Sequence, residues 1–145
     1  METNGISQAA LLGIAAGMRT SVPLAALGLT LPRRRWAGAP LALGSAVELV
    51  YDKLPRTGER TAPGPLLTRV VAGAIAGGIA ARVADDSIAL GIATGALAAL
   101  ASTFYFHRAR AAGARRVPPL AAAIAEDLIA VGIATAALRR LPRAR

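Results

Sequence analysis

Long apolar runs, separated by short charged or proline-containing stretches, dominate the hydropathy pattern of this chain. Residues 87–107 form an uncharged run that as a helix would extend about 31 Å, which matches the hydrocarbon thickness of a bilayer. The pattern predicts an all-α fold, a polytopic membrane helix bundle with about five transmembrane segments in a single domain, residues 1–145. The five apolar segments cover approximately residues 8–31, 36–51, 66–84, 87–107 and 117–138.

Several of these segments are short or interrupted by polar residues. The connection DKLPRTGERTAPGP, residues 52–65, is rich in proline and glycine and predicts a loop. A soluble helical bundle is therefore the alternative, since short Ala-rich helices also form soluble cores. Against it, soluble amphipathic helices repeat polar residues along one face, and the segments over 66–84 and 87–107 do not.

Glycines recur four residues apart within the predicted helices. This small-xxx-small spacing lets membrane helices approach each other closely, so we expect these glycines at helix contacts. The alternative is chance, because a chain rich in alanine and glycine produces such spacing without any packing role. The glycines concerned are Gly13, Gly17, Gly73, Gly77, Gly91 and Gly95.

The two halves of the chain resemble each other. LGIAAG at residues 12–17 recurs as LGIATG at 90–95, and PLA at 40–42 recurs at 119–121. Residues 8–55 and 87–138 would then be two-helix repeats around a linking helix, residues 66–84. With one span between them, the second unit would enter the membrane from the opposite side, as in the inverted repeats of transporters. Five alternating spans also place Met1 and Arg145 on opposite faces.

Composition agrees with a membrane location. Hydrophobic residues make up 54% of the chain and the mean hydropathy is +0.50, well above a typical soluble protein. The net charge of +9 would suggest a nucleic-acid partner in a soluble protein. Here the arginines cluster at predicted helix ends, where they would meet lipid headgroups, and aromatic residues for base stacking are scarce. No nucleic-acid partner is therefore expected.

The N-terminus and the absence of cysteine narrow the picture further. The chain begins METNGISQAALLG without an early lysine or arginine, so we expect the first apolar run to be retained rather than cleaved as a signal peptide. Without cysteine, disulfides and thiolate sites are excluded. The predicted spans place equal numbers of basic residues on the two sides of the membrane, so the positive-inside rule does not predict how the protein is oriented.

Arg19 is the first candidate for contact with a ligand. A charge deep in a bilayer costs several kcal/mol and so needs a partner or a water-filled cavity. Arg19 lies in GMRTSVP, where Pro23 removes a backbone donor and interrupts the helix. A broken helix would expose backbone dipoles beside the guanidinium, which favours a site for an anion or a polar solute. The alternative is a structural ion pair with an acid on another helix.

Glu48 and Asp52 lie four residues apart in ELVYDKLP, which places both carboxylates on one helical face. Two like charges this close need a cation such as Arg19 or Arg69, a metal ion or a shared proton. We expect Arg19 to pair with one of these two acids. The alternative is a helix end at the membrane interface with solvated acids, which the following lysine and proline favour.

The remaining polar residues are less specific. Glu126 and Asp127 are adjacent, so on a helix they point about 100° apart and cannot face the same partner. We expect at least one of them to face the bundle interior. Asp85 and Asp86 fall in a short turn and are expected to be solvated, and His107 is expected at the membrane interface. The chain contains no nucleophile triad, phosphate loop or zinc spacing, so neither an enzyme nor a metal or other cofactor is expected.

Three stretches of this sequence resemble an uncharacterised family of small bacterial membrane proteins, a domain of unknown function. These are GMRTSVP, ELVYDKLPRTGERTAPGPLLTRVVAGAIAG, and GIATGALAALASTFYFHRAR followed by AEDLIAVGIA. The resemblance covers nearly the whole chain and implies a multi-span protein of the bacterial inner membrane, without implying an activity. The matching positions are Arg19, Pro23, Glu48, Asp52, Lys53, Arg60, Arg69, Glu126 and Asp127.

Two functional hypotheses follow. The first is a small, homo-oligomeric transporter or channel-like protein for a small ion or polar solute in the lipid bilayer. The second is a non-transporting scaffold or assembly factor, whose basic loops bind anionic lipid or a partner protein. A cavity that reaches Arg19 or Glu48 favours the first hypothesis, and a sealed bundle favours the second. The predicted path is lined by Arg19, Pro23, Glu48, Asp52, Arg69, Glu126 and Asp127.

Overall fold

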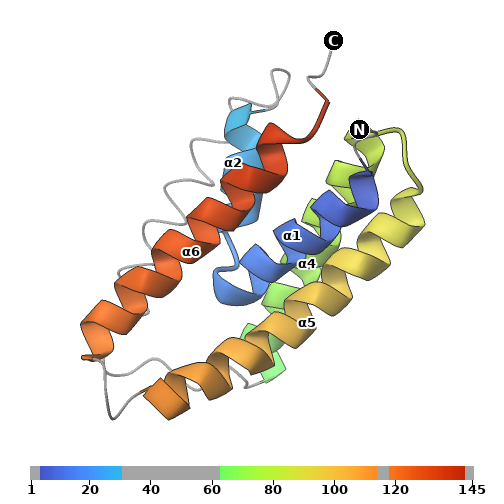
Figure 1. The fold of residues 1–145 in the computed structure, drawn as a ribbon. Coiled ribbons are helices and arrows are strands. Elements are labelled where there is room, and N and C mark those ends of the chain that lie inside the picture. Colours follow the sequence, from blue (N-terminus) through green and yellow to red (C-terminus); the bar gives the residue numbers. More distant parts are fainter. Residues whose placement is uncertain (1–3, 31–62, 114–117, 143–145) are drawn as a thin grey trace.

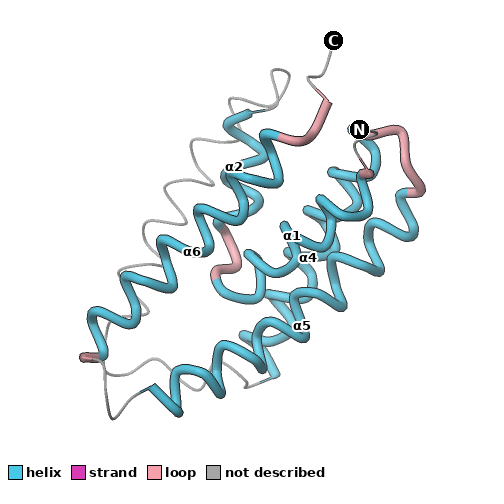
Figure 2. Tube along the Cα trace, viewed as in Figure 1, coloured by secondary structure: helices cyan, strands magenta, loops and turns pink. Residues whose placement is uncertain are grey.

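The computed structural model describes residues 4–30, 63–113 and 118–142, and these residues form helices joined by short turns, with no strand among them (Figures 1 and 2). This confirms the predicted all-α class. The predicted segment over 36–51, with Glu48, and most of the 52–65 loop lie outside the described residues. The helices are α1 (Gly5–Met18), α2 (Val22–Thr30), α4 (Pro63–Val83), α5 (Ile88–Gly113) and α6 (Pro119–Arg139).

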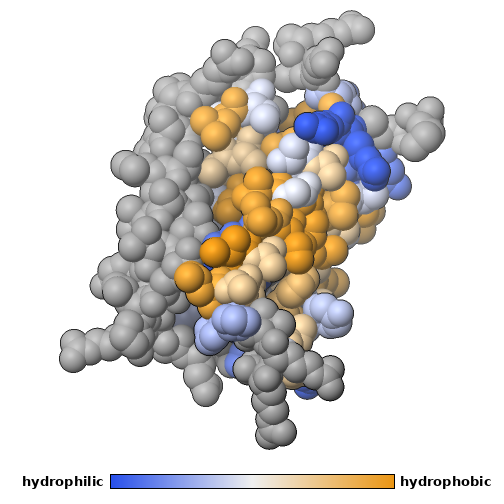
Figure 3. Space-filling view, turned by 60° about the vertical axis from the view of Figure 1, so that its left-hand side comes forward, coloured by the Kyte–Doolittle hydropathy of each residue, from blue (hydrophilic) through white to orange (hydrophobic). Residues whose placement is uncertain are grey.

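Three of these helices, α4, α5 and α6, are long and apolar enough to cross a membrane. Their outer faces are apolar, with exposed side chains such as Leu67 on α4, Leu97 on α5 and Leu128 on α6. In Figure 3, hydrophobic residues cover the middle of the described surface and hydrophilic ones lie toward its two ends. Because such a surface is stable in lipid and not in water, the protein is a helical membrane bundle.

The first apolar segment differs from its prediction. Residues 8–31 do not form one interrupted span, because α1 ends at Met18, Arg19 is extended (φ −143°, ψ 114°) and α2 begins at Val22. With 14 residues, α1 reaches only about 21 Å, too short to cross a bilayer of about 30 Å. Pro23 is tolerated in the first turn of α2, where its missing N–H has no helical acceptor.

Helix α2 turns back along the bundle. Leu27, near its end, shares a core cluster with Leu12 of α1, Ala80 of α4 and Ala137 of α6. Figure 1 shows α2 running toward the end of the bundle from which α1 starts. The two helices therefore form a re-entrant pair. We call residues 19–21, where the chain reverses direction inside the bundle, the tip.

Glycines bring α1, α4 and α5 into close contact. A Cβ atom built on Gly13 of α1, or on Gly73 of α4, would overlap the backbone carbonyl of Gly95 on α5. A Cβ on Gly77 would overlap the carbonyl of Gly91, and one on Gly17 would overlap Ser102 of α5. The structure thus places all six predicted packing glycines at close contacts between two helices, where an added Cβ would not fit.

The directions of these helices differ from the inverted-repeat prediction. Gly13 lies beside Gly95 and Gly17 beside Ser102, so α1 and α5 run in the same direction. An inverted repeat would place LGIAAG of α1 and LGIATG of α5 in opposite directions. Much of the second helix of the first repeat lies outside the described residues. The similar hexapeptides are instead parallel neighbours that pack on each other.

Both ends of the described chain lie at one end of the bundle. The end of α1 pairs through Arg19 with Asp127 in the first half of α6, whereas Leu12 packs in one cluster with Ala134. Helices α1 and α6 are therefore antiparallel, and the start of α1 lies level with the end of α6 (Figure 1). This arrangement differs from the prediction, based on five alternating spans, that the two termini lie on opposite faces.

The turn between α4 and α5 also stabilises α1. Asp85 adopts a left-handed conformation (φ 56°), and the N–H of Asp86 donates to the carbonyl of Ala81 at 2.8 Å, which closes the end of α4. The Asp86 carboxylate accepts a hydrogen bond from the N–H of Gly5 at 2.6 Å, where the α1 dipole favours an anion. Asp85 is exposed as predicted, but Asp86 is only half-exposed because it caps α1.

Candidate functional site

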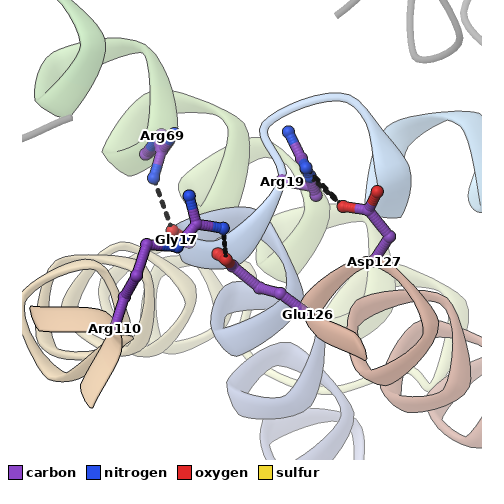
Figure 4. A network of polar contacts seen from close by, with 6 residues as sticks. All are labelled: Gly17, Arg19, Arg69, Arg110, Glu126 and Asp127. Carbon is purple, nitrogen blue, oxygen red and sulfur yellow. Dashed lines mark hydrogen bonds and ion pairs between the residues drawn. The ribbon is translucent and has the colours of Figure 1, made fainter. Parts of the chain in front are cut away.

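The tip of the α1–α2 pair is held by an ion pair. Arg19 is 1% exposed, and its Nε donates to Oδ1 of Asp127 on α6, while its Nη2 forms an ion pair with the same oxygen (Figure 4). Pairing is required here because a lone guanidinium buried in a membrane bundle would be strongly unfavourable. The predicted alternative for Arg19, an ion pair with an acid on another helix, is present.

Arg69 stabilises the end of α1 from α4. Its Nη1 donates to the carbonyl of Gly17 at 2.9 Å, and the Thr103 hydroxyl of α5 donates to the same carbonyl at 3.2 Å. The Ser102 hydroxyl donates to the carbonyl of Ile14 at 3.1 Å. The last carbonyls of a helix have no intrahelical donor, and a cation at this end complements the helix dipole. Arg69 therefore stabilises the end of α1, where the helix is interrupted.

A second ion pair links α5 to α6. Nη2 of Arg110, near the end of α5, donates to Oε2 of Glu126, whose side chain is 8% exposed (Figure 4). Glu126 and Asp127 thus bind different arginines, as the angle between neighbouring helical positions predicts. Glu126 is buried in the bundle, which agrees with the prediction that one of these acids faces the interior.

The structure brings four of the predicted site residues together: Arg19, Arg69, Glu126 and Asp127. Pro23 is buried in the first turn of α2, just beyond the tip. Glu48 and Asp52 lie outside the described residues, so their predicted pairing with Arg19 stays a prediction.

Sequence reasoning did not assign Arg110, Ser102 or Thr103 to this site. In the sequence, Arg110 is one of several basic residues at a predicted helix end. One signal in the sequence is that Arg110 and Glu126 lie equally far from Pro118, the residue before the first residue of α6. Ser102 and Thr103 lie within an uncharged run, and no local pattern distinguishes them from other small residues.

The site combines paired charges with two helix ends. The carbonyl end of α1 and the N–H end of α2 meet at the tip, so partial charges of both signs lie beside Arg19 and Asp127. Within residues 4–30, 63–113 and 118–142, no three His, Cys, Asp or Glu side chains are grouped to hold a metal ion. The side chains at the tip supply paired charges and hydrogen-bond donors.

Comparisons with known proteins gave no matching family model, no matching curated protein and no matching solved structure.

Proposed function

We propose that the protein is a small transporter or channel-like protein for a small ion or polar solute, with the tip of the α1–α2 pair in the path. The observation that carries this proposal is the helix break inside the bundle beside the Arg19–Asp127 ion pair. Non-helical backbone at membrane depth is tolerated where protein buries it or where it lines a cavity, and transporters use such broken helices to bind ions and solutes.

We further propose that it acts in the bacterial inner membrane as a homo-oligomer. The resemblance of GMRTSVP and ELVYDKLP to small bacterial inner-membrane proteins supports the location. The exposed apolar faces of α5 and α6, with Leu97 and Leu128, support association with lipid and with a second copy.

The experiment is a flux measurement in proteoliposomes with a panel of small inorganic cations and anions. We expect the purified full chain to raise the flux of at least one ion above empty vesicles. The variant Arg19→Leu/Asp127→Leu removes both charges of the pair, so it should remain folded and lower this flux to background. Arg82→Leu is the control, because Arg82 is exposed at the end of α4 and should leave the flux unchanged.

The second candidate is a non-transporting scaffold. The observation that favours it is the near-complete burial of Arg19 and Glu126, each in an ion pair, as expected of purely structural charges. Flux at background for every ion, or full flux from the Arg19→Leu/Asp127→Leu variant, would contradict the transport proposal. In the first case, complementation of a deletion strain by that variant would support the scaffold.

A further inference from the structure

One face of α5 carries an exposed apolar stripe that ends in an arginine. Leu97, Ala101, Tyr105 and Arg108 recur every three or four residues, so their side chains lie above one another on the helix. All four are exposed, Leu97 at 66% and Tyr105 at 67%. Phe104, beside the stripe, is 40% exposed. In a bilayer, this face of α5 is therefore open to acyl chains along its length.

The length of α5 places this stripe in one leaflet. The polar turn at Asp85 and Asp86 precedes Ile88, so the start of α5 marks one edge of the hydrocarbon region. From Ile88 the helix rises about 30 Å to Arg108, which is the thickness of that region. Arg108 is thus level with the lipid headgroups at the end of the bundle far from the N-terminus (Figure 1). Leu97 lies about 16 Å before Arg108, close to the bilayer midplane.

Arg108 differs from its neighbour Arg110 in its contacts. Arg110 pairs with Glu126, whereas Arg108 is exposed and makes no ion pair with any residue of 4–30, 63–113 or 118–142. A guanidinium binds phosphate oxygens through charge-assisted and often bidentate hydrogen bonds. The Tyr105 hydroxyl, one turn deeper, lies at the depth where tyrosines meet the membrane interface and can donate to a lipid oxygen.

We propose that this face of α5 binds an anionic phospholipid, with the phosphate on Arg108 and one acyl chain along Tyr105, Ala101 and Leu97. An anionic headgroup is favoured because a zwitterionic headgroup brings a cation of its own next to the guanidinium. The other end of α5 follows the carboxylates of Asp85 and Asp86, so α5 binds this lipid in one leaflet only. The interaction is independent of transport and adds a lipid partner to the protein.

Native mass spectrometry of the full chain in non-ionic detergent tests the proposal, with dioleoylphosphatidylglycerol and dioleoylphosphatidylcholine as probes. We expect one phosphatidylglycerol to bind more tightly than phosphatidylcholine. Arg108→Gln should weaken phosphatidylglycerol binding about tenfold, the effect of losing one charge-assisted hydrogen bond, while its melting temperature in detergent stays that of the wild type. Arg139→Gln is the matched control and should keep the wild-type affinity, because Arg139 is exposed at the end of α6, a helix without aromatic residues.

Photocrosslinking locates the lipid on the helix. A trace of phosphatidylglycerol with a diazirine in the middle of one acyl chain, in phosphatidylcholine vesicles that contain the full chain, should label the segment from Leu97 to Tyr105. Arg108→Gln should reduce this labelling about tenfold, as it reduces binding. Soluble glycerol phosphate, which has the phosphate without the chains, should not displace the probe.

Four results would each overturn the lipid site. These are equal affinity for the two lipids, equal weakening by Arg108→Gln and Arg139→Gln, labelling that Arg108→Gln leaves unchanged, and displacement by glycerol phosphate, which would show a site for phosphate alone. None of them depends on whether the protein carries an ion, so the lipid site and the transport proposal stand or fall separately.

Discussion

Arg19 shows how a single residue can require a particular tertiary arrangement. A guanidinium that is 1% exposed within a membrane bundle must be neutralised, and Asp127 from α6 supplies the carboxylate. Arg69 has a different role although it has the same side chain, because its donor meets the carbonyl of Gly17 at the end of α1. One arginine thus ties the tip to α6 and the other ties α1 to α4.

The Arg19–Asp127 pair predicts a non-additive effect on stability. Arg19→Leu or Asp127→Leu alone leaves a buried charge without its partner, which typically costs about 3–5 kcal/mol. The double variant removes both charges, so it should recover much of this loss. Apparent melting temperatures in detergent measure the effect, with Arg82→Leu as the exposed control. Purely additive losses would show that the two side chains do not stabilise each other.

At the scale of the helices, close approach depends on the absence of side chains at a few positions. Gly95 of α5 lies where α1 and α4 both reach α5, opposite Gly13 and Gly73. These contacts hold the long helices α4 and α5 against α1, which is too short to cross the membrane by itself. Small residues at these points therefore keep the re-entrant pair inside the bundle.

Gly95→Ala should destabilise the bundle, because the added Cβ would overlap the carbonyl of Gly73. Overpacking of this kind costs about 1–3 kcal/mol. Gly132→Ala is the matched control on α6, since a Cβ there meets nothing within 4 Å and alanine is the better helix former by up to about 1 kcal/mol. Thermal unfolding in detergent compares the two. Equal behaviour of both variants would mean that α4 and α5 are further apart than the structure shows.

At the scale of the whole molecule, the re-entrant pair sets the topology. Helix α1 enters from one end and α2 returns to it, so these two helices do not carry the chain across the membrane. Helix α5 starts at the same end as α1 and finishes at the other, where Arg108 and Arg110 lie. The start of α1 and the end of α6 therefore lie at one end of the bundle.

Single cysteines test this topology in vesicles of known orientation. Asn4→Cys and Pro142→Cys should react with an impermeant thiol reagent from the same side of the membrane. Arg108→Cys should react from the opposite side, because α5 carries the chain across. Reaction of Asn4→Cys and Pro142→Cys from different sides would instead indicate that the first apolar segment, residues 8–31, crosses the membrane.

The sequence alone predicted the helical membrane bundle, the helix interruption near Arg19, and the ends of the three long helices to within three residues, except the end of α5, which lies at Gly113 rather than at residue 107. These features follow from local properties. Hydropathy, the length of an apolar run and the helix-breaking effect of proline depend only on residues close together in sequence, so they can be recognised before the fold is known. The angle between Glu126 and Asp127 is equally local, which is why their separate partners could be anticipated without naming them.

Only the tertiary structure decided that α2 turns back and that Asp127, Arg110 and Asp86 receive their present partners. One span over 8–31 and two helices that reverse direction are built from the same apolar residues, so hydropathy does not distinguish them. The direction of α2 after the break depends on the surfaces of α4 and α6 against which Leu27 packs. Which acid pairs with which arginine depends on the helices that lie side by side at the level of each charge. Both are properties of packing between segments distant in sequence, which no local pattern encodes.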